Sequence, residues 1–121
     1  MLADASVWVD HLRRGNATLV ARLENQQAWT HPFVIGELAC LNILRRAEFL
    51  EALAALPQLP RVPDADVLAM VTTRRLMRRG LSWIDVHLLA AATLAQIPLL
   101  THHLPLAVVA GESGLSWPAA Y

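Results

Sequence analysis

The apolar positions of the chain form short runs of a few residues that alternate with longer stretches at helical spacing. The first run, Met1 to Ala3, ends at Asp4, and residues 5–14 then have the pattern of a helix that Gly15 terminates, with Ser6 as its cap. Similar patterns predict further helices over residues 16–24, 32–44, 45–56, 64–78, 82–95 and 104–110, and further short strands over 27–30, 97–101 and 115–117.

Short strands that alternate with helices predict an α/β sandwich with a mostly parallel sheet. At 121 residues the chain is expected to form one domain, residues 1–121. The proline-rich segment 57–63 is too short for a linker between domains and is interpreted as a connection back to the sheet. The helix predicted over 82–95 is apolar on nearly all sides, which indicates a buried helix.

Composition and charge narrow the class of protein. Apolar residues make up 55% of the chain, so we expect a folded protein that also buries surface against a partner. Ten acids balance ten arginines, which argues against a protein that coats nucleic acid. The arginine-rich segment 74–79 suits either the negative end of a helix or a polyanion. No apolar run is long enough to span a membrane, no signal peptide is seen and a single cysteine excludes an internal disulfide, so we expect a cytoplasmic protein.

Three acids in separate parts of the chain stand at predicted junctions. Asp4 follows a strand, Glu37 stands beside a glycine near a helix start, and Asp85 is three residues after the N-cap candidate Ser82. Each has an ordinary alternative: Asp4 as a helix-start residue, Asp85 as a partner of the helix dipole, and Glu37 as a solvent-facing side chain. If the fold gathers them, their mutual repulsion requires a cation, and Mg²⁺ or Mn²⁺ suits hard oxygen ligands.

Other chemistries have little support. The chain has no glycine-rich phosphate loop, no zinc-ligand spacing and no nucleophile elbow. Cys40 has apolar neighbours and is predicted to lie in the core. His11, His31 and His87 show no ligand spacing, and we expect them at the surface or rim.

Three segments together resemble the PIN-domain VapC-type toxins of bacterial toxin–antitoxin pairs. They are Asp4-Ala5-Ser6-Val7-Trp8-Val9-Asp10-His11-Leu12-Arg13, Thr30-His31-Pro32-Phe33-Val34-Ile35-Gly36-Glu37-Leu38-Ala39 and Arg79-Gly80-Leu81-Ser82-Trp83-Ile84-Asp85-Val86-His87-Leu88-Leu89-Ala90. The resemblance extends from Met1 to about Ala110 and keeps the order and spacing of all three segments.

The resemblance implies a PIN-like three-layer sandwich and a metal-dependent endoribonuclease that cuts structured RNA such as tRNA or ribosomal RNA. It implies a homodimer held inactive by a VapB-type antitoxin. Asp4 and Asp85 match residues that bind Mg²⁺ or Mn²⁺, Glu37 completes the acidic cluster, and Ser6 matches a hydroxyl residue close to the metal. The implied reaction is attack of metal-activated water on a phosphodiester.

One position departs from the family pattern. His103 stands in the strand-end segment where family members usually carry an acid, and an imidazole suits Mn²⁺ better than Mg²⁺. We therefore expect an active enzyme that prefers Mn²⁺, with His103 as a further candidate ligand. The alternatives are a degenerate PIN-fold module that binds its antitoxin without cutting RNA, and an unrelated dimeric α/β scaffold.

Overall fold

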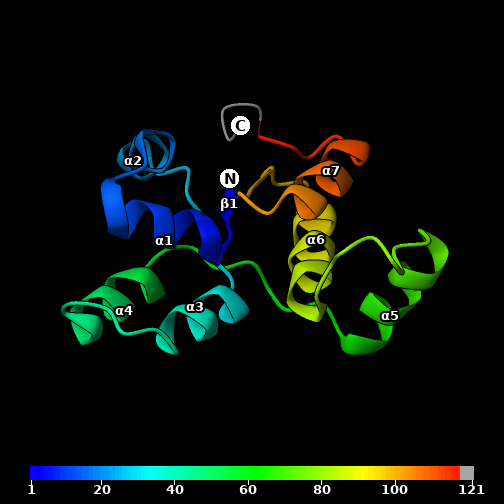
Figure 1. The fold of residues 1–121 in the computed structure, drawn as a ribbon, viewed down its shortest axis with the longest axis horizontal. Coiled ribbons are helices and arrows are strands. Elements are labelled where there is room, and N and C mark those ends of the chain that lie inside the picture. The colour runs from blue at the N-terminus through cyan, green and yellow to red at the C-terminus, as the bar shows by residue number, and fades with distance from the viewer. Residues whose placement is uncertain (118–121) are drawn as a thin grey trace.

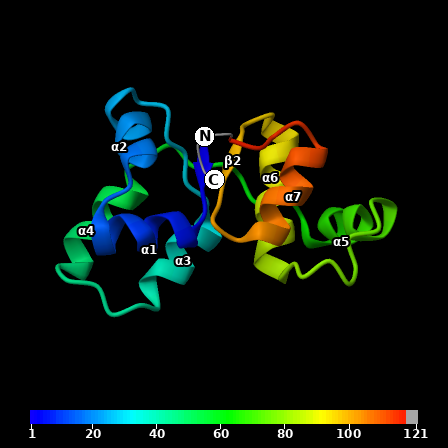
Figure 2. The same cartoon turned by 45° about the horizontal axis from the view of Figure 1, so that its top comes forward.

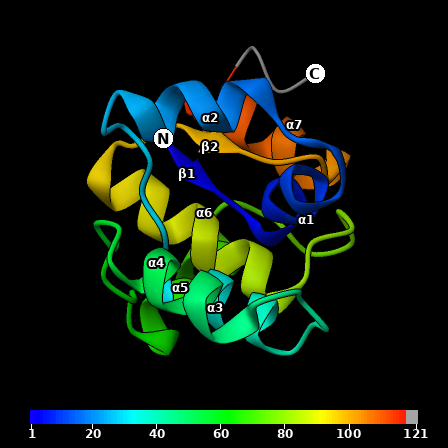
Figure 3. The same cartoon turned by 90° about the vertical axis from the view of Figure 1, so that its left-hand side faces the viewer.

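Two short parallel strands form the centre of the molecule. The computed structural model describes residues 1–117. Strand β1 (Leu2–Ala3) pairs with β2 (Leu99–Leu100), so that Leu2 lies opposite Leu99 and Ala3 opposite Leu100. Figure 3 shows the two strands side by side beneath α2 and α7. All four strand residues are fully buried, which is typical of a parallel sheet covered on both faces.

Helices cover both sides of this sheet. In Figures 1 and 2 helices α1 to α4 lie on one side of the strands and α5 to α7 on the other. Their bounds are α1 Ala5–Arg14, α2 Ala17–Glu24, α3 Pro32–Ala39, α4 Arg46–Ala54, α5 Asp64–Thr73, α6 Trp83–Ala95 and α7 Leu104–Glu112. The predicted three-layer α/β architecture is therefore confirmed.

Helix α6 forms the centre of the helical packing on its side. Every residue from Val86 to Ala92 is buried, as its all-round apolar pattern predicts. At its start the Ser82 side chain accepts a hydrogen bond from the Asp85 amide. With 13 residues α6 is the longest described helix, and no helix within residues 1–117 is long and apolar enough to cross a membrane.

Two predicted strands are reduced to isolated bridges. In the predicted strand 27–30, Trp29 pairs with Leu2 and Thr30 pairs with Gln58, and in 115–117 Ser116 pairs with Leu99; all three bridges are parallel. The central strands are themselves two residues long, because α1 begins directly after Asp4. Little edge is therefore left for a neighbouring segment to pair with.

Two helices end earlier than predicted. The helix expected over 32–44 stops at Ala39, and the helix expected over 64–78 stops at Thr73. Arg75 and Arg78 have φ angles of 54° and 64°, which a helix cannot contain. The arginine-rich segment 74–79 therefore lies after the helix and forms turns.

Candidate functional site

Asp4 occupies the carboxyl end of β1 and also begins α1. Its Oδ1 accepts a hydrogen bond from the Val7 amide at 3.3 Å, so Asp4, and not the predicted Ser6, is the N-cap of α1. The side chain is only 5% exposed. The two interpretations of Asp4, helix-start residue and strand-end functional group, are therefore both satisfied by one side chain.

Two hydroxyl groups hold the Asp4 carboxylate from opposite sides. Ser6 Oγ donates to Oδ1 at 2.5 Å, and Thr101 Oγ1 donates to Oδ2. The backbone amides of His102 and His103 in turn donate to the Ser6 and Thr101 hydroxyls, each at 3.0 Å. Because each hydroxyl accepts from an amide, its one proton is directed to Asp4. The loop between β2 and α7 thereby fixes the position of the carboxylate.

The Asp85 carboxylate is fixed by a capping box at the start of α6. Its Oδ2 accepts from the Ser82 amide at 2.9 Å while the Ser82 hydroxyl accepts from the Asp85 amide at 3.1 Å. Gly80, two residues before this cap, has φ of 78°, as expected for a turn that needs glycine. The Asp85 side chain stays 15% exposed, so it reaches solvent while it caps the helix.

Burial and neighbouring acidic residues affect the ionisation of Asp4 and Glu37. Burial raises the pKa of Asp4, its hydroxyl and amide partners oppose that rise, and the charge of Asp85 adds to it. Burial likewise raises the pKa of Glu37, and the charges of Asp4 and Asp85 raise it further. The fold thus brings Asp4, Glu37 and Asp85 within electrostatic reach of each other. Glu37 is half-buried and is not the ordinary solvent-facing glutamate that its local sequence allowed.

A divalent cation fits the chemistry of these donors. The charges of Asp4 and Asp85 raise the pKa of Glu37, and these three carboxylates offer the oxygen ligands that Mg²⁺ and Mn²⁺ prefer; a cation would remove the repulsion. Within residues 1–117, however, no group of three carboxylate, imidazole or thiol side chains is already arranged to hold a metal ion. The side chains would therefore have to close around the cation when it binds.

His103 lies beside Asp85. Its Nε2 is 3.0 Å from the Gly80 carbonyl oxygen and 3.4 Å from Asp85 Oδ2. Both neighbours are hydrogen-bond acceptors, so Nε2 carries a proton in this arrangement. The imidazole here orients Asp85, and Nε2 could ligate a metal only after leaving these contacts.

Thr101 is the member of the site that the sequence analysis missed. It is fully buried and follows β2 directly, as Asp4 follows β1. In a parallel pair with Ala3 opposite Leu100, the next residues are neighbours. The signal was thus a hydroxyl residue at the same place after the second buried strand.

The predictions for three residues, His31, His87 and Cys40, are wrong. His31 and His87, expected at the surface or rim, are fully buried, because both pack against the ring of Phe33, with ring centroids 5.2 and 4.7 Å apart. Cys40, expected in the core, is exposed because α3 ends before it. A Cβ added at Gly36 would meet no protein atom within 4 Å, so no other backbone segment comes close to this glycine.

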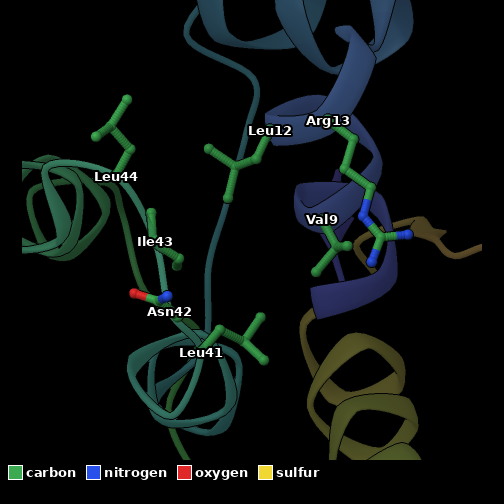
Figure 4. A pocket seen from close by; sticks show the side chains of 7 residues that line it. All are labelled: Val9, Leu12, Arg13, Leu41, Asn42, Ile43 and Leu44. Atoms are coloured by element: carbon green, nitrogen blue, oxygen red, sulfur yellow. The ribbon is translucent and has the colours of Figure 1, made fainter.

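Two apolar hollows on the surface differ in their position relative to the carboxylates. One hollow between α3 and the start of α6 includes Glu37 in its lining. Another, of about 340 Å³, separates α1 from the connection between α3 and α4. Figure 4 shows Val9 and Leu12 of α1 on one side of it, with Leu41 and Ile43 on the other.

Comparisons with known proteins identify the family and agree with the fold. The family model for the PIN domain matches residues 1–110. Ribonuclease VapC32 of Mycobacterium tuberculosis, in strain CDC 1551 / Oshkosh and in strain ATCC 25618 / H37Rv, is 41% identical over 117 residues, which are 96% of this chain and 94% of the relative. The crystal structure of PAE2754 from Pyrobaculum aerophilum superposes with a TM-score of 0.59 over 88% of this chain and 82% of that one, and its 17% identity shows a shared fold alone.

Proposed function

Because the chain belongs to the PIN-domain family and to its VapC type, we propose that it is a divalent-metal-dependent endoribonuclease, the toxin of a toxin–antitoxin pair. The observation that carries the proposal is that Asp4, at the carboxyl end of β1, and Asp85 lie close enough to Glu37 for their charges to raise its pKa. The carboxyl ends of the strands are where open α/β sheets bind their ligands.

Asp4 and Asp85 would hold Mg²⁺ or Mn²⁺, with Ser6 and Thr101 fixing Asp4 and with Ser82 and His103 fixing Asp85. Asp4 Oδ1 already accepts two hydrogen bonds, whereas Oδ2 accepts one and keeps a lone pair free. A bound divalent cation would lower the pKa of the attacking water and would stabilise the negative charge that develops on the phosphate.

Glu37 is suited to accept the proton of the attacking water. Its pKa is raised toward the range in which a carboxylate is an effective base. Water would attack phosphorus, its proton would pass to a Glu37 carboxylate oxygen, and the bond from phosphorus to the departing ribose oxygen would break. That oxygen would then take up a proton from solvent.

A VapB-type antitoxin and a second copy of the chain are the proposed protein partners, and tRNA or ribosomal RNA is the proposed substrate. Exposed apolar side chains support the need for partners: Leu12 and Leu41 are each 42% exposed and Leu44 is 90% exposed. Leu12, Leu41 and Leu44 all line the hollow shown in Figure 4. Covering such a surface would be favourable in proportion to the apolar area removed from water.

The test is cleavage of total RNA by antitoxin-free protein in Mn²⁺, with Asp85→Asn as the variant. An asparagine oxygen can still accept the Ser82 amide, so this variant is expected to fold. The matched control is Asp66→Asn, which neutralises an exposed aspartate in the first turn of α5. Discrete products from the parent and from Asp66→Asn, and none from Asp85→Asn, are expected.

A degenerate module that binds its antitoxin without cutting RNA is the second candidate. His103 in place of the usual acid and the absence of a ready-made metal group within residues 1–117 favour it. If the folded parent protein yields no cleavage products in either Mn²⁺ or Mg²⁺, the binding module becomes the favoured function in place of the ribonuclease.

A further inference from the structure

The hollow between α3 and the first turn of α6 adjoins the carboxylates. It has a volume of about 310 Å³, and its lining includes Phe33, Gly36, Glu37, Cys40, Trp83 and Ile84. Its surface is almost wholly apolar apart from Glu37. We call it the aromatic hollow. Because Glu37 belongs to both, whatever occupies the aromatic hollow lies next to the proposed site of cleavage.

Trp83 presents a fixed indole ring to this hollow. The residue is 42% exposed although it is the first residue of a buried helix. Its ring contacts the buried imidazole of His87, with centroids 4.5 Å apart and planes at 88°. In a perpendicular contact His87 can cover at most one face of the indole. The ring is therefore held in place while another flat ring can stack on it.

Gly36 leaves one part of the hollow open. It lies inside α3, where glycine costs about 0.5–1 kcal/mol relative to alanine. Its φ is not positive, and a Cβ at this position would meet no atom within 4 Å. Neither backbone conformation nor close packing thus requires a glycine here. A larger side chain at this position would instead project into the hollow.

A positive charge lies beside these rings. The Arg61 guanidinium stands 4.9 Å over the centre of the Phe33 ring. Its side chain is 53% exposed, and its ion pair with Asp64 is long, at 3.6 Å. The guanidinium therefore keeps hydrogen-bond donors available, and a guanidinium suits phosphate.

We infer that the aromatic hollow binds one unpaired nucleobase of the RNA, next to the phosphodiester that is cut, by stacking the base on Trp83. Arg61 binds a neighbouring phosphate. A flat ring bearing a phosphate matches an apolar hollow with a free aromatic face and a guanidinium beside it. The inference rests on the proposed ribonuclease function. It requires the RNA to be single-stranded at this nucleotide, because a base within a duplex has both faces stacked.

The experiment measures the binding of a fluorescently labelled single-stranded RNA, in EDTA so that it is not cut, and of the same RNA as a duplex. Trp83→Leu removes the ring and Trp83→Phe keeps one. Gly36→Leu fills the hollow and leaves Trp83 in place. Leu94→Ala, at a leucine that is 76% exposed near the other end of α6, is the matched surface control.

We expect single-stranded RNA to bind about tenfold more weakly to Trp83→Leu and Gly36→Leu, with Trp83→Phe and Leu94→Ala close to the parent. Gly36→Leu should also melt at a higher temperature than the parent, because leucine is the better helix former. Lost binding in this variant cannot then be ascribed to unfolding. Duplex binding should be the same in all variants.

Each other result overturns the inference in a distinct way. If the parent cuts RNA but Trp83→Leu and Gly36→Leu bind single-stranded RNA as tightly as the parent does, the proposed base site is wrong and the proposed ribonuclease function stands. A folded parent that neither binds nor cuts RNA removes both. Variants that bind RNA normally but bind the antitoxin more weakly would make the hollow a protein-docking surface.

Discussion

The Thr101 hydroxyl donates a hydrogen bond to the buried carboxylate of Asp4, joining the residues that follow the two parallel strands. A carboxylate that is 5% exposed needs donors inside the protein, because water does not reach it freely. Thr101 and Ser6 supply them from opposite sides. The stability of the fold and the geometry of the site therefore depend on the same hydrogen bonds.

Thr101→Val keeps the shape of the side chain and removes the donor. We expect the free energy of unfolding to fall by about 1–3 kcal/mol, the cost of leaving a buried polar group without its partner. Urea denaturation at neutral pH measures it. The control is Thr93→Val on the exposed side of α6, where about 0.5 kcal/mol or less is expected. Equal losses in the two variants would show that the Asp4 contact contributes nothing.

Glu37→Gln should make the protein more stable at neutral pH. The raised pKa of Glu37 means that the folded protein keeps a proton which the unfolded chain releases near its ordinary pKa of 4.5. The free energy of unfolding therefore falls as pH rises from about that value through the raised pKa. In Glu37→Gln this fall should be smaller, as urea denaturation across this pH range would measure. Glu24→Gln, at an exposed position, should follow the parent. A curve for Glu37→Gln parallel to that of the parent would contradict the raised pKa of Glu37.

Replacing His103 should change the metal preference. An imidazole beside Asp85 favours Mn²⁺, so the parent is expected to cut RNA faster in Mn²⁺ than in Mg²⁺. His103→Asp restores the family's usual acid and should increase the rate in Mg²⁺ relative to Mn²⁺. The initial rate of RNA cleavage is measured with each cation. A parent that cuts equally fast or faster in Mg²⁺ would rule out a preference for Mn²⁺.

His31 should destabilise the protein in acid. Burial, with the nearby charges of His87 and Arg61, lowers the pKa of His31 to about 4 from 6.5. Between these values the unfolded chain binds a proton that the folded protein excludes, so stability is lost as pH falls through this interval. In the parent, the Phe33 amide donates a hydrogen bond to His31 Nδ1 at 2.9 Å. The side-chain oxygen of His31→Asn can still accept this hydrogen bond, but asparagine does not titrate. Melting temperatures across the interval should fall less in the variant, and an equal fall would assign the acid sensitivity to other groups.

Chemical modification of Cys40 should weaken the binding of single-stranded RNA. The thiol is exposed and lines the aromatic hollow, so a bulky maleimide attached to it would occupy the proposed base site. We expect the labelled parent to bind single-stranded RNA more weakly than the unlabelled parent. Cys40→Ser, whatever its own affinity, should be unchanged by the reagent. A fully labelled parent with undiminished affinity would place the RNA elsewhere.

Local signals predicted where elements begin better than where they end. Ser82 caps α6 as predicted, and the helix predicted over 16–24 begins with the cap Asn16, since a cap depends on residues within one turn. The predicted ends failed where apolar spacing continued beyond the helix. Leu41 and Leu44 fit the pattern of α3 yet lie exposed after it.

The sequence predicted those parts of the site that depend on residues close together in the chain. The positions of Asp4 and Asp85 follow from short-range motifs, whereas their coupling to Glu37 depends on packing between α1, α3 and α6. Thr101 lies 97 residues from Asp4 and becomes its neighbour only through strand register. The burial of His87 likewise depends on rings from other parts of the chain.

The pairing of Leu2 with Leu99 has a consequence for the time at which the site forms. A polypeptide grows from its N-terminus, so Asp4 leaves the ribosome long before the strand that buries it has been made. Its carboxylate gains the Thr101 donor only after the chain has grown by a further 97 residues. A nascent chain therefore carries Asp4 without the hydrogen bond that fixes its carboxylate until β2 and Thr101 have been made.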